Sequence, residues 1–420
     1  GRLIAPAVKV IRATPVASFI VLVLLWAPTG RVPAVVSALM VLPVLWGNVC
    51  KGIGQTDPKL LEAAGAYRFS PGKKLRLIYV PCALPYVASG CATALGLAEM
   101  IASGVTCIAD MYMNNEAIIQ EVLSAGISAN ICCGATQFTD GFDPETHHDC
   151  VVQRQLTERW HGAGEGQIAI DGSIHGEYTS HAPLWEWMAR YAADHGLGMH
   201  VHLSETKSEH DGCVARHGRT PAALFEQYGI FAVRAIAAHC VWTTPDDWAI
   251  LARNGVSAVT NPMSNLKLGS GIAPLKGLRQ AGVNVALGTD GVSSNNSTDL
   301  FADMKLAAIL TCGAEHDPMA VTAWDALETA TVNGARALGR KAGRVAPGYT
   351  ADLILVDFDR PNLIPCHDTV ENLVYAAHGA DVCMNMARGR VIYQNGAFLT
   401  IDLDRVKREI RDYALPLLFG

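Results

Sequence analysis

Between residues 104 and 289, short apolar stretches alternate with longer ones in which apolar residues recur every three or four positions. The short stretches predict buried strands, and the longer ones predict amphipathic helices. Strands and helices in this rhythm are typical of a parallel sheet, and about eight such units close into a TIM-type (β/α)8 barrel. Seven strands are predicted, at residues 104–110, 126–134, 166–175, 196–203, 234–240, 255–260 and 283–289.

The first 98 residues follow a different pattern. Three uncharged runs, at residues 13–30, 32–50 and 77–98, are each close to the ~20 residues with which a helix spans a bilayer. They predict hydrophobic helices, and residues 13–98 are expected to contact a membrane. The alternative is that they are buried helices of a large core, since each run contains proline. The polar loop at residues 51–76 carries six basic residues and two acids, which predicts a cytoplasmic position.

Charge divides the chain at the same place. Residues 1–98 hold ten Lys and Arg but only two acids, whereas the whole chain has a formal charge of −6. All 14 histidines follow residue 146. Two parts of such different composition are not expected to share one core, and the acidic balance argues against a nucleic-acid binder.

Cysteine usage indicates the redox environment. The 12 cysteines include no C-x-x-C pair and show no regular spacing. This usage favours reduced, mostly buried thiols in a cytosol-like compartment, not a disulfide framework.

Four polar residues come at or just after the ends of predicted strands: His175, His202, His239 and Asp290. The active sites of such barrels lie at the carboxyl ends of the strands. Each residue alone has an ordinary structural explanation. One of His200 and His202 could be only a core histidine, and an aspartate after Gly-Thr is commonly a helix N-cap. Four of them on the strands of one sheet favour a functional site.

Several segments resemble the amidohydrolase superfamily, and in particular its methylthioadenosine/S-adenosylhomocysteine deaminase branch. The segment at residues 175–180 is similar to the substrate-facing part of those enzymes, and the segment at 343–357 resembles the start of their small β-sandwich half. The resemblance covers about residues 99–400 and rests on Met-His-Val-His-Leu-Ser-Glu-Thr at 199–206, Ala-His-Cys-Val-Trp at 238–242, Asn-Pro-Met-Ser-Asn-Leu-Lys-Leu at 261–268 and Gly-Thr-Asp-Gly at 288–291.

This resemblance implies roles for individual residues in the hydrolytic deamination of a purine nucleoside. His202 and Asp290 would bind one divalent metal ion, expected to be zinc with iron as the alternative, and the metal would activate a water molecule. Asp290 would accept the proton of that water, His239 would polarise it, and Glu205 would protonate the ring nitrogen. His175, Glu205 and Asp290 would contact the substrate.

The resemblance also exposes a gap, because the family's first strand carries a His-x-His pair that supplies two further metal ligands. Residues 1–98 contain no histidine. The expected fold is therefore an incomplete barrel that lacks its first strand, and impaired metal binding and activity are expected. The expected domains are hydrophobic helices at 1–98, the barrel at 99–340, and a partial β-sandwich with a C-terminal helix at 341–420.

The loop at 51–76 contains Leu-Leu-Glu-Ala-Ala, which resembles the coupling loop of ABC-transporter permeases of the nitrate/taurine type. That likeness implies contact with an ABC ATPase and predicts a chimeric chain, with the deaminase part cytoplasmic and an inner-membrane location if residues 1–98 insert. A chlorohydrolase, a guanine or cytosine deaminase, and a permease fragment carrying the barrel as a passenger are the alternative functions. A homo-oligomer is left open.

Overall fold

Parallel strands form the centre of the larger of two units in the computed structural model, which describes residues 69, 71–74, 93–139 and 141–416. This unit comprises residues 96–115 and 125–400. Its strands pair in chain order within two parallel sheets, β1 to β3 and β4 to β8. They are β1 (Cys107–Met111), β2 (Ser128–Cys132), β3 (Ile168–Ile170), β4 (Gly172–Ile174), β5 (Met199–Leu203), β6 (Ala235–His239), β7 (Ser257–Thr260) and β8 (Asn284–Leu287).

The α/β class and the parallel strands are confirmed. Every predicted strand is present, and the one predicted over residues 166–175 is divided at Asp171 into β3 and β4. No ladder joins β8 to β1 among the residues that the structure describes, so closure into a barrel that lacks one strand stays a prediction.

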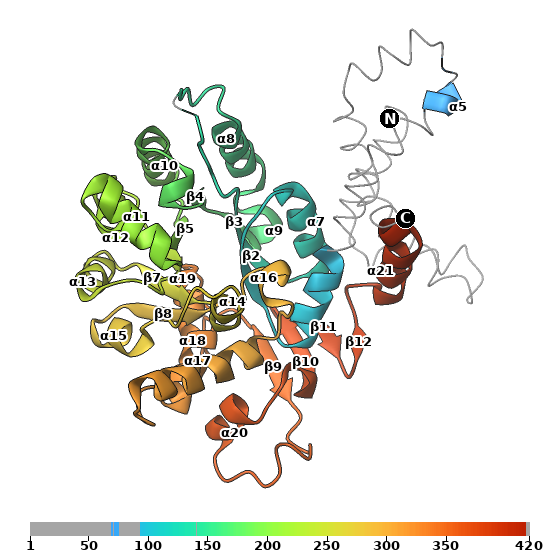
Figure 1. Ribbon diagram of the computed structural model, residues 1–420. Coiled ribbons are helices and arrows are strands. Elements are labelled where there is room, and N and C mark those ends of the chain that lie inside the picture. Colours follow the sequence, from blue (N-terminus) through green and yellow to red (C-terminus); the bar gives the residue numbers. More distant parts are fainter. Residues whose placement is uncertain (1–68, 70, 75–92, 140, 417–420) are drawn as a thin grey trace. The chain divides into compact units, whose positions relative to one another are not determined.

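Helices follow the strands and lie around the outside of them (Figure 1). Threonine and aspartate side chains accept hydrogen bonds from the first backbone N–H groups of several helices, as Thr244 does for α13 and Asp299 for α17. Such caps fix where each helix begins, and hence the length of the loop before it. The helices of this unit are α8 (His148–Trp160), α9 (Ala163–Gly166), α10 (Ala182–Asp194), α11 (Lys207–His217), α12 (Pro221–Gln227), α13 (Pro245–Arg253), α14 (Pro262–Lys267), α15 (Leu275–Gln280), α16 (Val292–Asn295), α17 (Leu300–Glu315), α18 (Ala323–Ala330), α19 (Val332–Ala337) and α20 (Thr369–Tyr375), with the 3-10 turns η3 (Glu177–Thr179) and η4 (Gly379–Asp381).

The core lies between the strands and this outer layer. Trp185 of α10 and Phe225 of α12 are almost fully buried, and their rings meet edge to face with centroids 5.9 Å apart. They belong to one cluster with Met199 and Val201, whose side chains point outward from β5. Residues 200 and 202 alternate with these apolar positions, so the histidines of β5 face the opposite side of the strand.

An ion pair with a buried carboxylate joins the amino ends of the strands. Asp171, in the break between β3 and β4, accepts hydrogen bonds from the backbone N–H of Gly198 at 3.1 Å and from Nδ2 of Asn130 at 2.9 Å, and it pairs with Arg234. Arg234 also donates to the carbonyl of Ala337 at 2.9 Å. A Cβ atom at residue 198 would overlap the Arg234 guanidinium, so glycine leaves the space that the pair needs.

Replacing Asp171 by alanine is therefore expected to lower the free energy of unfolding by about 3 kcal/mol, because Arg234, Asn130 and Gly198 would all lose the buried carboxylate that accepts their hydrogen bonds. Chemical denaturation followed by circular dichroism measures this change. The exposed pair of Lys207 with Asp211 provides the control, since Asp211→Ala should change stability by less than about 1 kcal/mol. Equal effects of the two substitutions would contradict a structural role for Asp171.

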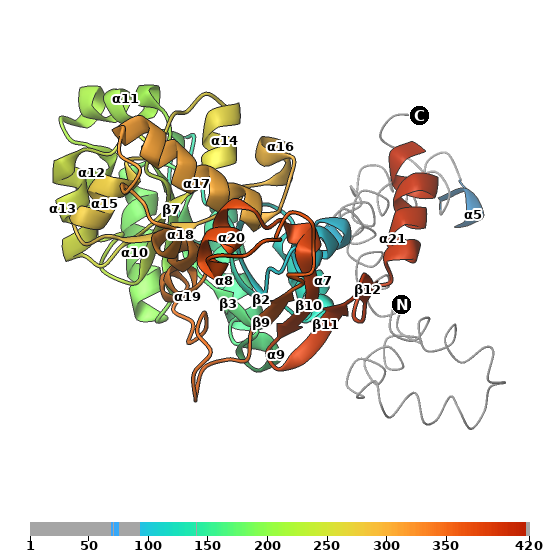
Figure 2. The ribbon, with the colours of Figure 1, turned by 90° about the horizontal axis from the view of Figure 1, so that it is seen from below.

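The C-terminal part of the larger unit forms one antiparallel sheet in the order β12-β11-β10-β9 (Figure 2). This sheet lies in the segment where a partial β-sandwich was expected, and the sandwich stays a prediction. Nδ2 of Asn385 in β10 donates to the carbonyls of Ile101 and Val105, which ties the sheet to the turn before β1. The strands are β9 (Leu353–Val356), β10 (Val382–Ala387), β11 (Arg390–Gln394) and β12 (Ala397–Phe398).

Helical structure crosses the junction that the sequence predicted between residues 98 and 99. Residues 93–102 are helical, and Leu97, Ala98 and Ile101 are buried. Oε1 of Glu99 accepts a hydrogen bond from the backbone N–H of Thr298 at 3.0 Å, which ties the helix to the segment after α16. The last residues of the third apolar run thus belong to the same unit as the strands.

Most of residues 13–98 lies outside the described residues, and so does nearly all of the loop at 51–76. The membrane helices and the ATPase contact predicted there stay predictions. Within the ranges that the structure does describe, no helix is both long and apolar enough to cross a membrane. The described parts of the smaller unit include residues 93–95, α5 (Pro71–Lys74), residues 116–124 of α7 (Asn115–Ala125), α21 (Leu403–Glu409) and the π-helix η5 (Ile410–Ala414).

Candidate active site

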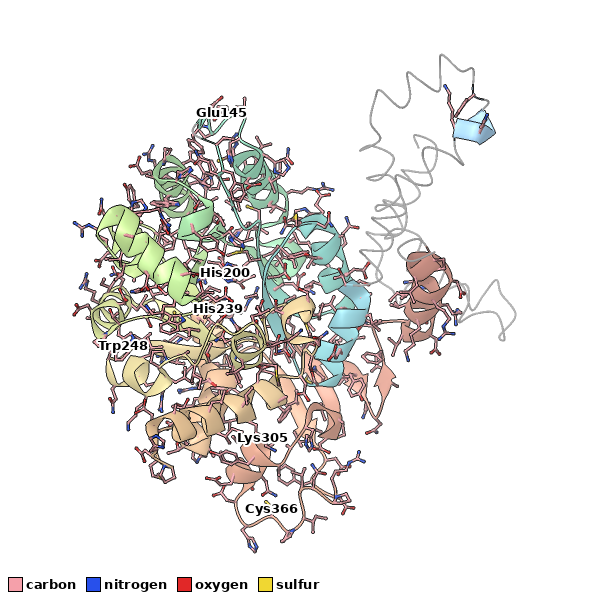
Figure 3. All side chains as sticks on the ribbon, viewed as in Figure 1. Glu145, His200, His239, Trp248, Lys305 and Cys366 are labelled. Carbon is pink, nitrogen blue, oxygen red and sulfur yellow. The ribbon has the colours of Figure 1, made fainter. Side chains whose placement is uncertain are left out.

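Three of the predicted histidines meet at the carboxyl ends of β4, β5 and β6. The ring centroid of His202 lies 4.9 Å from that of His175 and 5.3 Å from that of His239. The parallel register of β5 and β6, which pairs Leu203 with His239, produces this meeting. Figure 3 labels His239 in the central part of the unit, whereas Glu145 and Trp248 lie toward the periphery of that view.

His202 is held in one tautomer. Its Nδ1 donates a hydrogen bond to the carbonyl oxygen of His175 at 2.7 Å, which leaves the lone pair of Nε2 free. Burial, with smaller contributions from His239 and His175, lowers the pKa of His202 to about 4, so the ring is neutral at neutral pH. A neutral imidazole whose second nitrogen donates to a carbonyl is the usual form of a metal-ligating histidine.

The two histidines of β5 have different surroundings. Nδ1 of His200 lies 3.6 Å from Sγ of Cys132 on β2, and burial lowers the pKa of His200 to about 3. His202 instead faces His175 and His239. His200 therefore has the surroundings of a core histidine, while His202 lies among the candidate site residues.

Glu205, three residues beyond His202, lies beside His239. Its Oε2 is 3.8 Å from Nε2 of His239, and its Oε1 accepts a hydrogen bond from the hydroxyl of Ser270 at 3.0 Å. Nδ1 of His239 donates to Oδ1 of Asn265 at 2.8 Å, which turns Nε2 toward the glutamate. The side chain of Glu205 remains 21% exposed, so a ligand can reach a carboxylate whose direction is fixed.

Asp290 follows β8 and is held on both oxygens. Oδ2 accepts a hydrogen bond from the hydroxyl of Ser264 on α14, and Oδ1 accepts one from the backbone N–H of Gly291 at 2.6 Å. Its negative charge raises the pKa of His202, against the dominant effect of burial.

The backbone at these strand ends adopts left-handed conformations. The φ angles are 48° at Ser204, 73° at His239 and 60° at Asp290, although none of these residues is glycine. Backbone strain of this kind persists where the surrounding structure enforces it and is concentrated at functional sites.

The described residues do not complete a metal site. His202 and Asp290 are suitable ligands, but catalytic zinc sites usually hold three protein ligands. No group of three or more His, Cys, Asp or Glu side chains that could hold a metal ion occurs in the described part of the chain. The set found here thus falls short of the expected metal centre by at least one ligand.

Sequence reasoning missed the residues that orient the site. Asn265, Ser264 and Ser270 hold His239, Asp290 and Glu205 respectively. Two of the three lie in the segment at 261–268, which was noted for its resemblance but not assigned a role. For Ser270 the sequence offered no signal.

Comparison with known proteins agrees with this geometry. Residues 88–392 match the amidohydrolase family. A 5-methylthioadenosine/S-adenosylhomocysteine deaminase of Moorella thermoacetica is 41% identical over 318 residues, which cover 75% of this chain and 73% of that protein. A 5'-deoxyadenosine deaminase of Methanosarcina acetivorans is 37% identical over 77% of this chain and 74% of its own length.

The fold is shared with solved structures as well. The crystal structure of a zinc-bound adenosine deaminase from Xanthomonas campestris superposes with a TM-score of 0.74 at 29% identity, covering 80% of this chain and 76% of that one. The family match spans well over half of the chain, and these relatives extend along about three quarters of it. The chain belongs to the amidohydrolase family.

Proposed function

We propose that this protein is a hydrolytic deaminase of adenosine-type nucleosides, of the methylthioadenosine/S-adenosylhomocysteine class. The observation that carries the proposal is the arrangement of Glu205 against His239 and Ser270, beside His202 and His175. It offers a partly exposed carboxyl group beside three imidazoles, and such groups supply the general acid-base steps that attack of water on a purine requires. Relatives that deaminate methylthioadenosine, S-adenosylhomocysteine and 5'-deoxyadenosine support the same substrate class.

The proposal assigns a role to each side chain of the site. Glu205 delivers a proton to the ring nitrogen of the purine, and His239 stays aligned with the attacking water because Asn265 holds its other nitrogen. Asp290, fixed by Ser264 and Gly291, takes the proton of that water. His175 contacts the nucleoside, and a hydrogen bond between its Nδ1 and the hydroxyl of Thr179 at 3.1 Å holds its ring.

A divalent metal, zinc or alternatively iron, would supply the activated water in this family. His202 and Asp290 would be its ligands in this chain. Because the described residues offer no third ligand, metal binding and turnover are proposed to be impaired. We place the protein in the cytoplasm, since none of the nine cysteines that the structure describes forms a disulfide.

Purified protein is therefore expected to hold clearly less than one zinc ion per chain and to lose it to a mild chelator, because two protein ligands bind weakly. Elemental analysis before and after dialysis measures the content. His202→Ala should lower it further, and the matched His200→Ala should leave it unchanged. One tightly held zinc per chain would contradict this, and its loss in His200→Ala would identify a replacement ligand.

A panel of substrates tests the function itself. The full chain, with excess zinc, is incubated with adenosine, methylthioadenosine, S-adenosylhomocysteine and 5'-deoxyadenosine, and ammonia release is followed. Slow conversion is expected, and Glu205→Gln should remove it. Conversion of guanine, cytosine or a chlorinated triazine with no conversion of nucleosides would instead favour the other amidohydrolase activities.

A further inference from the structure

A second carboxylate, that of Glu209, accepts a hydrogen bond from the backbone of Glu205 and has no role in the reaction proposed above. Glu209, on the first turn of α11, is only 6% exposed. Its Oε1 accepts a hydrogen bond from the backbone N–H of Ser204 at 2.9 Å, and its Oε2 accepts one from the backbone N–H of Glu205 at 2.8 Å. One side chain thus satisfies both backbone donors at the point where the chain leaves β5.

This turn needs such support. Ser204 has a φ of 48°, a conformation that is unfavourable for a residue with a side chain. The hydroxyl of Ser204 lies 3.0 Å from Nδ1 of His210, and Oγ1 of Thr206 accepts a hydrogen bond from the backbone N–H of Glu209 at 3.2 Å. Hydrogen bonds therefore connect the strained turn to the start of α11, and the Glu209 carboxylate accepts two of them.

The direction in which the Glu205 side chain points depends on these hydrogen bonds. The Glu205 carboxylate reaches Ser270 at 3.0 Å and His239 at 3.8 Å only if its own Cα is held at the turn, because β5 ends two residues earlier. The carboxylate of Glu209 presents one oxygen to each of the two backbone N–H groups, so it holds the strained backbone at two points.

We propose that Glu209 is a positioning residue: its carboxylate fixes the backbone of Ser204 and Glu205 and so aims the Glu205 side chain at Ser270 and His239. The consequence for catalysis rests on the proposed function, since it matters only if Glu205 delivers a proton. A displacement of about 1 Å at such a group lowers a rate by about 10²-fold. The backbone part of the proposal is independent of any substrate.

Amide hydrogen exchange on the full chain tests the backbone part. Glu209→Gln keeps the size of the side chain but offers one acceptor oxygen in place of two, and exchange at residues 204 and 205 is expected to accelerate by about 10- to 100-fold. Asp211→Asn, on the same helix but exposed, is the matched control and should leave exchange there unchanged. Glu209→Ala, which removes both acceptors, should show an acceleration at least as large.

Two results would overturn the proposal. One is unchanged exchange at residues 204 and 205 in both Glu209 variants. The other is equal acceleration throughout β5 and α11, which would indicate general loss of stability in place of local positioning.

Kinetics test the catalytic part. In a form of the chain that turns over nucleoside, Glu209→Gln should lower kcat by about 10²-fold and leave KM within about threefold, because binding groups stay in place while the proton donor moves. A rise in KM at constant kcat would overturn the positioning role. If no form of the chain turns over a nucleoside, the proposed function fails by itself, and the exchange measurement still decides whether Glu209 holds the turn.

Discussion

Replacing residues 1–87 by the N-terminal segment of an intact relative is expected to raise nucleoside deamination by at least about 10³-fold. The resemblance places a His-x-His pair and a substrate-binding glutamate in that segment, and residues 1–98 of this chain contain no histidine to replace the pair. With His202 and Asp290 the graft would bring the number of protein ligands to four. Conversion of methylthioadenosine is followed by the ultraviolet shift from adenine to hypoxanthine, and zinc content should rise to about one per chain.

The structure indicates where the graft should join. The family match begins at residue 88, and residues 96–102 of the helix lie in the same unit as the strands, with Glu99 bonded to Thr298. A joint at residue 98 would cut this helix, whereas a joint at 87 leaves residues 93–102 uninterrupted. The matched control carries the same graft with both transplanted histidines replaced by alanine. If the graft binds zinc but converts none of the nucleosides, the substrate class is wrong and only the broader amidohydrolase assignment stands.

The strands could be predicted because each carries a local signal. Buried strands of a parallel sheet consist of short apolar runs, and all seven predicted runs contain one. The position of the candidate site could also be predicted, since the carboxyl ends of parallel strands meet at one edge. The break at Asp171 could not, because it depends on Arg234 and Gly198, which are distant in sequence.

The contacts that orient the site required the structure for the same reason. Ser270 is 65 residues from Glu205, and Ser264 is 26 residues from Asp290. The conformations of the loops after β5, β7 and β8 bring them together, and periodicity does not encode loop conformation. The end of the apolar run at 77–98 was ambiguous for a different reason. An uncharged run has the same sequence pattern whether its residues are buried in protein or in lipid.

In the grafted protein, Asp290→Asn is expected to lower kcat by about 10³-fold or more and to reduce zinc content, because Asp290 would both bind the metal and accept a proton. Glu205→Gln is expected to keep the zinc and lower kcat by about 10²- to 10⁴-fold, because glutamine preserves the hydrogen bond with Ser270 but carries no transferable proton. Elemental analysis and the ultraviolet assay separate the two effects.

Asp211→Asn serves again as the control for both substitutions, since this exposed residue pairs with the exposed Lys207. Loss of zinc in Glu205→Gln would show that the glutamate is a ligand and not the proton donor. Full activity in Asp290→Asn would remove the aspartate from the reaction and leave the strained backbone at residue 290, with its φ of 60°, without a functional explanation. The assignment of the proton donor therefore depends on zinc and activity responding differently to these two substitutions.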